Sequence, residues 1–229
     1  MTQVYKKPTE EAHEQLQKAY DFFNQSLFSG RLPSCLIIHA RKGRTYGYYS
    51  PDRWEREGAV RAVDEIALNP QHFRNRSIED VLSTLVHEMT HLEQHHFGKP
   101  ARRGYHDRAW GELMKRVGLY PSQTGKPGGK ETGQQMTHYI LKNGPFEKTV
   151  KELLNSGFSL TWSDTIQEGA SDNSDPANPK KKSKWKFTCS ACGQNSWGKA
   201  DTKIICGHDN QPMISPELEA FLGSVTDLA

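Results

Sequence analysis

The sequence predicts an α+β domain followed by a small cysteine-rich module. Helical patterns alternate with β-branched and aromatic runs before residue 166, a stretch without large apolar side chains follows, and three of the four cysteines lie near the C-terminus. A chain of 229 residues is long enough for one domain with an appendage. We therefore expect a globular domain at 5–165, a flexible linker at 166–184, a module at 185–215 and a tail at 216–229.

The first part of the domain predicts one helix and three strands. Apolar residues recur at helical spacing through residues 10–28, and Gly30 with Pro33 would end that helix. Runs rich in β-branched and aromatic residues, separated by turn residues, predict strands at 35–40, 45–50 and 62–70. Cys35 begins the first of these runs, and we expect it to be a small buried residue.

A second amphipathic helix is predicted between Ser77 and Gly98. The Ser77 hydroxyl can cap its N-terminus while Asp80 reaches back, as in a capping box. Apolar residues then recur at helical spacing to form a broad core face, and Gly98 with Pro100 would end the helix. We expect this helix to pack on a small mixed sheet.

Shorter elements complete the domain. A third helix is expected after His106, with Trp110 in its apolar stripe and Gly118 as its stop. The segments T-G-Q-Q-M-T-H-Y-I-L (132–141) and F-S-L-T-W (158–162) predict strands, and Pro145 marks the first turn of a short helix between them.

The second helix carries two histidines and a glutamate with the spacing H-E-x-x-H. Helical periodicity puts His87 and His91 one turn apart on one face, so both can bind one metal ion, and Glu88 lies beside them where it can hold a water. Zinc with three protein ligands lowers the pKa of a water in the fourth position to about 7, and a neighbouring carboxylate can take its proton. The same letters can occur by chance on a polar helix face, but the capped apolar helix around them favours a hydrolytic zinc site.

The H-E-x-x-H spacing does not identify the third metal ligand. The available residues are His95, His96, His106 and Glu112. At 1.5 Å rise per residue, His95 stands about 12 Å from His87, too far for one ion, so His95 and His96 are better explained as solvated. His106 begins the third helix after a loop that can turn back, whereas Glu112 within that helix would suit a zinc site with a glutamate ligand.

The C-terminal cysteines favour a second metal site over disulfides, because the N-terminus lacks the apolar core of a secretory signal. Cys189 and Cys192, followed by glycine, form a sound first zinc knuckle. The second knuckle has only Cys206, with His208 and Asp209 where another cysteine is usual. Either histidine or aspartate completes the site, or zinc is not held firmly; we prefer His208, because imidazole is the more common structural ligand. Trp185, Phe187 and Trp197 are expected to pack a miniature core.

Positive charge is concentrated near this module. Between Lys180 and His208 there are seven lysines and one acidic residue, although the whole chain carries a formal charge of only +3. Such a run is commonly a solvated linker end, but beside aromatic residues it can bind phosphates and stack bases. No apolar run is long enough to cross a bilayer, so we expect a cytoplasmic protein, monomeric and without a membrane partner.

The motif helix and its surroundings resemble the SprT-like zinc metalloproteases, which are related to the Spartan DNA–protein crosslink proteases. The resemblance rests on L-V-H-E-M-T-H-L-E-Q, on the histidine of G-Y-H-D-R-A-W-G-E-L-M-K-R-V-G-L fifteen residues after His91, and on F-N-Q-S-L-F-S-G-R-L-P, G-Y-Y-S-P and E-I-A-L-N-P upstream. It implies a zincin-like fold plus a C-terminal zinc-ribbon-like module, as bacterial members commonly carry. It also implies zinc ligands at His87, His91 and His106 and a general base at Glu88, and leaves Glu112 on the helix surface.

The resemblance implies peptide-bond hydrolysis in proteins bound or crosslinked to DNA, with one catalytic zinc and a second structural zinc. The implied partner is a protein substrate, whereas DNA binding by the basic C-terminal region is expected from the lysine run beside the module. The rival hypothesis is a nucleic-acid-binding zinc protein whose zincin domain is a non-catalytic scaffold, but the intact Glu88 argues against it, since a scaffold needs no base. Tyr105 and His138 are conceivable groups for stabilising the oxyanion.

Overall fold

The computed structural model describes residues 6–43, 45–165 and 184–219, and the chain divides into two compact units, Met1–Ser171 and Asp172–Ala229. The predicted linker at 166–184 lies outside the described residues except for Lys184, as does most of the predicted tail. In the part of the chain that the structure describes, no helix combines the length and the apolar character needed to span a bilayer.

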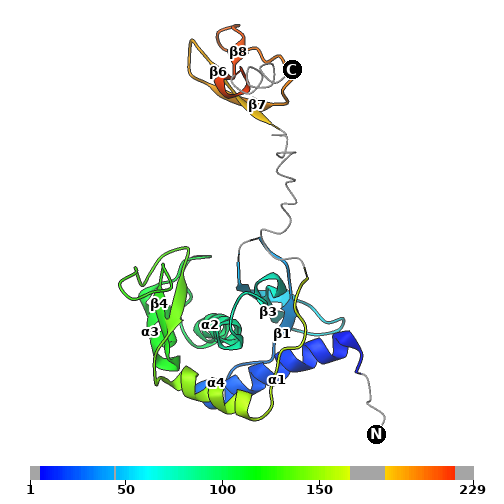
Figure 1. The fold of residues 1–229 in the computed structure, drawn as a ribbon, viewed down its shortest axis with the longest axis vertical. Helices are drawn as coiled ribbons and strands as arrows, with labels where there is room; N and C mark the ends of the chain where they lie inside the picture. Colours follow the sequence, from blue (N-terminus) through cyan, green and yellow to red (C-terminus); the bar gives the residue numbers. More distant parts are fainter. Residues whose placement is uncertain (1–5, 44, 166–183, 220–229) are drawn as a thin grey trace. The chain divides into compact units, whose positions relative to one another are not determined.

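The first unit has the mixed helix and sheet architecture that the sequence predicted (Figure 1). Its elements in chain order are α1 (Pro8–Phe28), β1 (Leu36–His39), β2 (Gly47–Trp54), β3 (Val63–Leu68), η1 (Pro70–His72), α2 (Ile78–Phe97), α3 (Arg108–Val117), β4 (Leu119–Ser122), β5 (Thr137–Ile140) and α4 (Pro145–Asn155). α2 lies between the sheet and the α3–β4 region, with α1 and α4 along one side of it.

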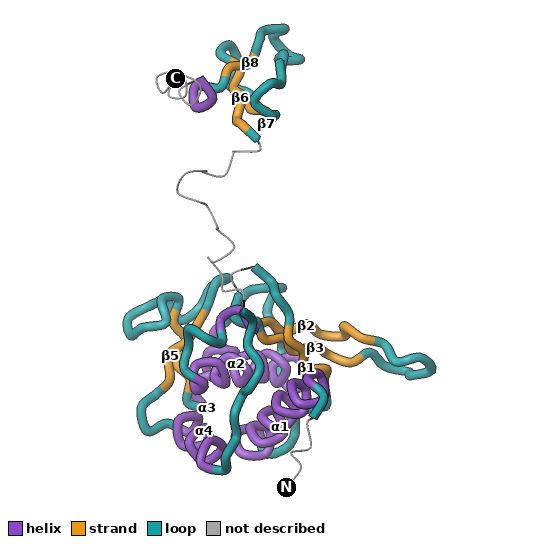
Figure 2. Tube along the Cα trace, turned by 45° about the vertical axis from the view of Figure 1, so that its right-hand side comes forward, coloured by secondary structure: helices purple, strands orange, loops and turns teal. Residues whose placement is uncertain are grey.

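The sheet is mixed, with strand order β1-β3-β2. β3 is central, parallel to β1 and antiparallel to β2, and its residues Ile66, Ala67 and Leu68 are fully buried. β2 is therefore an edge strand, and the β2–β3 hairpin extends beyond the helices (Figure 2). Its pairing shifts register between Ser50 and Trp54, where Asp52 has a φ of 47°, so the strand carries a bulge.

α2 is formed by the capping signals expected from its sequence. The Ser77 hydroxyl accepts a hydrogen bond from the Asp80 amide at 3.1 Å, and Gly98 ends the helix with its amide bonded to the Gln94 carbonyl. Most of its residues from Val81 to Gln94 are buried, because the sheet and the other three helices all contact it.

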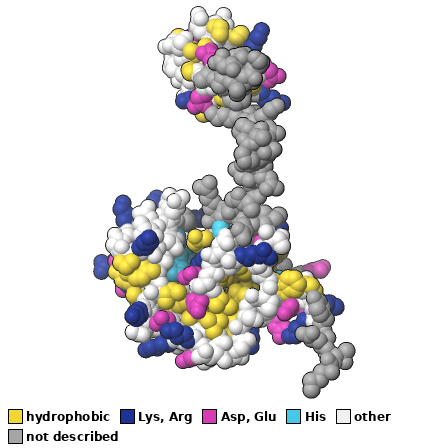
Figure 3. Space-filling view, viewed as in Figure 1, with side chains coloured by type: hydrophobic (Ala, Val, Ile, Leu, Met, Phe, Trp, Pro, Cys, Tyr) yellow, Lys and Arg dark blue, Asp and Glu magenta, His cyan; other side chains and the backbone are white. Residues whose placement is uncertain are grey.

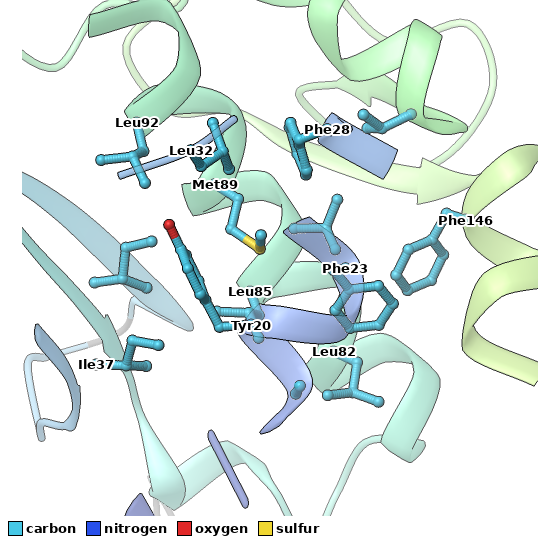
Figure 4. Close-up of a cluster of buried hydrophobic side chains, with 14 of the residues drawn as sticks. Tyr20, Phe23, Phe28, Leu32, Ile37, Leu82, Leu85, Met89, Leu92 and Phe146 are labelled. Atoms are coloured by element: carbon cyan, nitrogen blue, oxygen red, sulfur yellow. The ribbon is translucent and has the colours of Figure 1, made fainter. Parts of the chain in front are cut away.

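The core is built on the apolar face of α2. Figure 4 shows Tyr20 and Phe23 of α1 close to Leu82, Leu85 and Met89 of α2, all of them buried. On the α4 side, the rings of Phe23 and Phe146 stack with centroids 5.7 Å apart. The core therefore holds α2 by its apolar face. The face that carries His87 and His91 is left free to contact the loop before α3.

A buried carboxylate ties α2 to its neighbours on two sides. Glu93 is 1% exposed, and it forms ion pairs with Arg31 from the segment after α1 and with Arg116 near the end of α3. Because an unpaired carboxylate is strongly disfavoured in a protein interior, both arginines are held to it. The C-terminal end of α3 is thereby fixed against α2.

The strands predicted after residue 118 differ from those in the structure. Residues 158–162 form no strand; instead the Thr161 amide bonds to the Gln15 side chain and the Trp162 indole bonds to Glu11, so α1 side chains satisfy this segment. Conversely, β4 had no strand signal, because Pro121 interrupts its pattern, yet it pairs antiparallel with β5. The predicted strand at 132–141 contracts to β5.

The second unit is a small sheet with the strand order β7-β6-β8, formed by β6 (Trp185–Cys189), β7 (Asn195–Gly198) and β8 (Met213–Ile214). Trp185 and Phe187 are buried against Met213 and Leu218, as expected for a miniature core. Trp197 was expected in that core but is 62% exposed, because its position in β7 points it to the opposite face of the sheet.

Candidate metal centre

Three histidines from two elements meet beside α2. His87 and His91 come from consecutive turns of α2, and His106 comes from the loop that leads into α3. One ring nitrogen of each lies within 4.8 Å of the others, so the three can bind one ion. His87 is 7% exposed, and only small patches of histidine are visible on the face drawn in Figure 3.

The loop before α3 is held so that His106 faces α2. The Gln94 side chain of α2 donates to Asp107 Oδ1 at 2.9 Å, and the same oxygen caps α3 by accepting from the Trp110 amide at 2.8 Å. The His106 backbone pairs with Gly133, with N–H to O distances of 2.8 and 3.1 Å in the two directions. Neighbours on both sides thus fix the backbone that carries the third imidazole.

A buried tryptophan contacts all three imidazoles. The centroid of the Trp110 ring lies 4.9 Å from that of His87, 5.1 Å from that of His91 and 4.5 Å from that of His106. It is nearly parallel to the His91 ring, at 15°, and on β2 the Tyr49 ring is also nearly parallel to His91, at 8°. Trp110 was expected only as part of an apolar stripe, but it also sets the ring orientations at the centre.

The protonation of these rings suits a metal ion. Burial lowers the pKa of His91 to about 3, and it also lowers the pKa values of His87 and His106, so the imidazoles are neutral near pH 7. His106 Nδ1 lies 3.2 Å from the Gly133 carbonyl oxygen, which can only accept, so Nδ1 carries the proton and Nε2 keeps its lone pair. Three neutral nitrogen donors that converge in a buried place fit zinc.

Glu88 lies next to these ligands and lines the same cavity. Its side chain is 6% exposed, and burial raises its pKa to about 8. A bound cation would favour the ionised form, since opposite charge stabilises a carboxylate. A carboxylate whose proton affinity is set by such surroundings can both accept and return a proton near neutral pH.

The cavity is a cleft of about 1260 Å³ between two walls. One wall is the stretch Tyr46–Arg53 at and after the start of β2, and the other is the loop Pro100–His106 together with Gln134–His138. Gly47 lets the first wall approach α2, because a Cβ there would lie 2.8 Å from the Ala67 carbonyl oxygen and 2.9 Å from a Thr84 methyl group. Gly47–Ser50 of the edge strand β2 therefore line the same cleft as Glu88.

The alternative ligands considered for this centre lie elsewhere. Glu112 is exposed on α3, where Lys115 donates to it at 3.3 Å. His95 and His96 gather instead near the buried Asp64 of β3. That carboxylate accepts from His96 Nε2 at 2.6 Å, from the Tyr49 hydroxyl at 3.1 Å and from the Asp52 amide at 2.8 Å. Asp64 is thus satisfied by protein donors, and it ties the end of α2 to the sheet.

The two residues considered for the oxyanion differ in availability. Both ring nitrogens of His138 have partners, Nδ1 with His87 Nδ1 at 3.1 Å and Nε2 with Ser83 Oγ at 2.8 Å. Neither ring nitrogen of His138 is therefore free to donate to an oxyanion. Tyr105 lines the cleft with its ring under the Arg102 guanidinium, 5.0 Å from the centroid.

In the second unit, the three cysteines of the module meet an aspartate. Cys189, Cys192, Cys206 and Asp209 have ligand atoms within 4.8 Å of one another, and the three cysteines are free thiols. We expected His208 as the fourth ligand, but the structure places it outside this cluster. His208 is exposed, and its Nδ1 lies 2.9 Å from Asp209 Oδ1, so it contacts the carboxylate rather than the sulfur atoms.

The two halves of this cluster share one backbone design. The Gly193 amide bonds to the Cys189 carbonyl at 2.9 Å, and the Asn210 amide bonds to the Cys206 carbonyl at 2.8 Å. Gly193 and Asn210 also share a positive φ, of 73° and 53°. Since Asp209 precedes Asn210 as Cys192 precedes Gly193, Asp209 occupies the position of a fourth cysteine. Sequence reasoning favoured histidine by ligand frequency, whereas the repeat of C-x-x-[C/D] spacing was the signal for aspartate.

Comparison with known proteins gives two matches. The profile of the SprT-like family matches residues 16–129, which include the C-terminal part of α1, the sheet, α2, α3 and the three histidines. A Salmonella typhimurium protein described as an uncharacterized protein in the mucB 3′ region is 52% identical over 59 residues. That alignment covers 26% of this chain and 80% of the Salmonella protein, whose name states no activity.

We predict that His106→Ala lowers the zinc affinity of the histidine site at least about 100-fold, because only two ligands remain. Glu112→Ala, on the helix that follows His106, is the matched control and should leave zinc bound, since its carboxylate is exposed and paired with Lys115. Metal analysis of both variants after competition with a chelator measures the difference. The reverse ranking would assign the centre a glutamate ligand.

We also predict that Asp209→Ala weakens metal binding by the cysteine module about tenfold or more, whereas His208→Ala has little effect. Asp209→Cys should bind zinc at least as tightly as the wild type, because it supplies a fourth thiolate at an equivalent knuckle position. Thiolate-to-Co²⁺ charge-transfer absorption, displaced by added zinc, reports this site separately from the histidines. Loss of binding in His208→Ala alone would restore the Cys₃His assignment.

Proposed function

The chain belongs to the SprT-like family, and from the three histidines and Glu88 gathered in one cleft we propose that it is a zinc-dependent metallopeptidase. The observation that carries this proposal is the convergence of His87, His91 and His106 beside a buried carboxylate that faces an open cleft. Neutral imidazoles suit zinc, and an adjacent base suits hydrolysis.

In the proposed mechanism, His87, His91 and His106 hold zinc, and Glu88 handles the proton. When bound, zinc polarises the carbonyl of the scissile bond and lowers the pKa of water to about 7. Glu88 accepts a proton from the attacking water and then donates it to the leaving amine, which balances the hydrolysis of one peptide bond. Tyr105, in the opposite wall, is within the cleft and could donate to the oxyanion.

The free edge of β2 supplies a binding mode for the substrate. As an edge strand, it presents unpaired backbone donors and acceptors along Gly47–Ser50, in the wall of the cleft next to Glu88. An extended peptide segment can add to such an edge through main-chain hydrogen bonds, with little dependence on its sequence. We therefore propose that the substrate is an unfolded or locally extended protein segment.

We further propose that the second unit binds DNA, which would direct the peptidase to DNA-bound or DNA-crosslinked proteins. Lys186 and Trp197 are directly paired across β6 and β7, and both are exposed. Such a pair can neutralise a phosphate and stack a base on the same face. Lys184, Lys199 and Lys203 are also exposed, while Lys180, Lys181 and Lys182 lie outside the described residues.

The rival hypothesis, a nucleic-acid-binding protein with a non-catalytic scaffold, explains the module but not Glu88. Burial disfavours the ionised form of the Glu88 carboxylate and raises its pKa to about 8. A scaffold that only binds metal would gain from a neutral side chain at this position. Replacing Glu88 therefore separates the two hypotheses.

We predict that Glu88→Gln retains zinc at the histidine site but loses roughly 10²- to 10⁴-fold in the rate of peptide cleavage, because the proton acceptor is gone and the ligands remain. A fluorogenic unstructured protein substrate and metal analysis of the same sample measure both effects. Equal cleavage by wild type and variant would exclude Glu88 as the base.

We predict that changing Lys184, Lys186, Lys199 and Lys203 to Gln flattens the dependence of DNA affinity on salt, by about 0.7 in slope for each lost contact with single strands. Trp197→Ala should weaken binding at every salt concentration and leave the slope unchanged, because stacking releases no counterions. Lys18→Gln on α1 is the matched control. If all variants bind alike at every salt concentration, DNA does not use this face.

A further inference from the structure

A line of hydrogen bonds runs from the backbone of α2 through β5 to the first histidine of the centre. Ser83 Oγ donates to the Asp80 carbonyl at 2.8 Å, His138 Nε2 lies 2.8 Å from Ser83 Oγ, and His138 Nδ1 lies 3.1 Å from His87 Nδ1. Ser83 is 1% exposed and His87 is 7% exposed, so water competes little for these groups.

The direction of each proton along this line follows from its first member. A carbonyl can only accept, so the single hydroxyl proton of Ser83 points to Asp80. Ser83 Oγ must then accept from His138 Nε2–H, which leaves the Nδ1 atom of a neutral His138 with a lone pair. That lone pair can only accept a proton, so His87 carries its proton on Nδ1.

We propose that His138 is a positioning residue, which fixes His87 in the tautomer that presents its Nε2 lone pair to the metal centre. His106 reaches the same state through the Gly133 carbonyl, so two of the three ligands have an assigned outer partner. The inference rests on the proposed zinc centre. It also gives the β4–β5 hairpin a role, because β5 carries His138 against α2.

Two substitutions of His138 separate this role from simple packing. In His138→Asn the side-chain oxygen stands near the former Nδ1 and can still accept from His87. In His138→Gln the amide reaches the former Nε2 and can still contact Ser83, but the acceptor for His87 is lost. Both variants are neutral and polar, but Asn is smaller than histidine and Gln is similar to it in size, so a packing role would make His138→Asn the worse variant, the reverse of the ranking expected here.

The first readout is the tautomer of His87 in the metal-free protein, from the ¹⁵N chemical shifts of its ring. Wild type and His138→Asn should show a single form protonated at Nδ1, whereas His138→Gln should show a mixture of both tautomers. This measurement needs neither zinc nor catalysis. If wild type cleaves no peptide, the proposed function fails, while the tautomer result still decides the role of His138.

The second readout is the zinc affinity of the histidine site, followed by the histidine ring signals during competition with a chelator. His138→Gln should lose about 10- to 100-fold in affinity, and His138→Asn should stay close to wild type. Ser83→Ala removes the acceptor that orients His138, so it should also weaken zinc binding, and it serves where His138→Gln fails to fold. Equal tautomers and equal zinc affinities across these variants would overturn the proposal.

Discussion

The arrangement of the candidate metal centre depends on one buried charge, the carboxylate of Glu93. Arg31 and Arg116 neutralise it from opposite neighbours, so the segment after α1 and the end of α3 must both lie against α2. At the other end of α3, the bond from Gln94 to Asp107 does the same for the cap. With both ends of α3 fixed, the loop before it has little freedom, and the third imidazole arrives at a defined place. Polar contacts outside the centre thus supply its preorganisation.

Local signals explain why much of the fold was predictable. α2 was predictable from the cap at Ser77, the stop at Gly98 and the broad apolar face between them. Each of these signals depends on residues close together in the sequence. β4 and the segment after α4 were mispredicted for the opposite reason. Pro121 removes the strand signal of β4, which is stabilised by its pairing with β5. The Thr161 amide donates its hydrogen bond to the side chain of Gln15, 146 residues earlier in the chain. Long-range partners leave no periodic trace in a sequence.

The candidate site shows the same division. The H-E-x-x-H spacing places two imidazoles on one helix face by geometry alone, whereas His106 was selected over Glu112 by family resemblance rather than by any local rule. The contact between Trp110 and all three rings joins two helices, so periodicity marked it only as apolar. At the cysteine module, ligand frequency favoured His208, but the backbone repeat places Asp209 in the cluster.

The bulge in β2 has a consequence for self-association. A long unpaired strand edge is a template on which a second copy of the chain can add, and here such pairing would also cover the cleft. The register shift after Ser50, with the positive φ of Asp52, twists the outer part of the strand away from a regular ladder. The regular free edge is thereby confined to Gly47–Ser50, which can receive a short segment of another protein but offers too few hydrogen bonds to nucleate a shared sheet or a fibril.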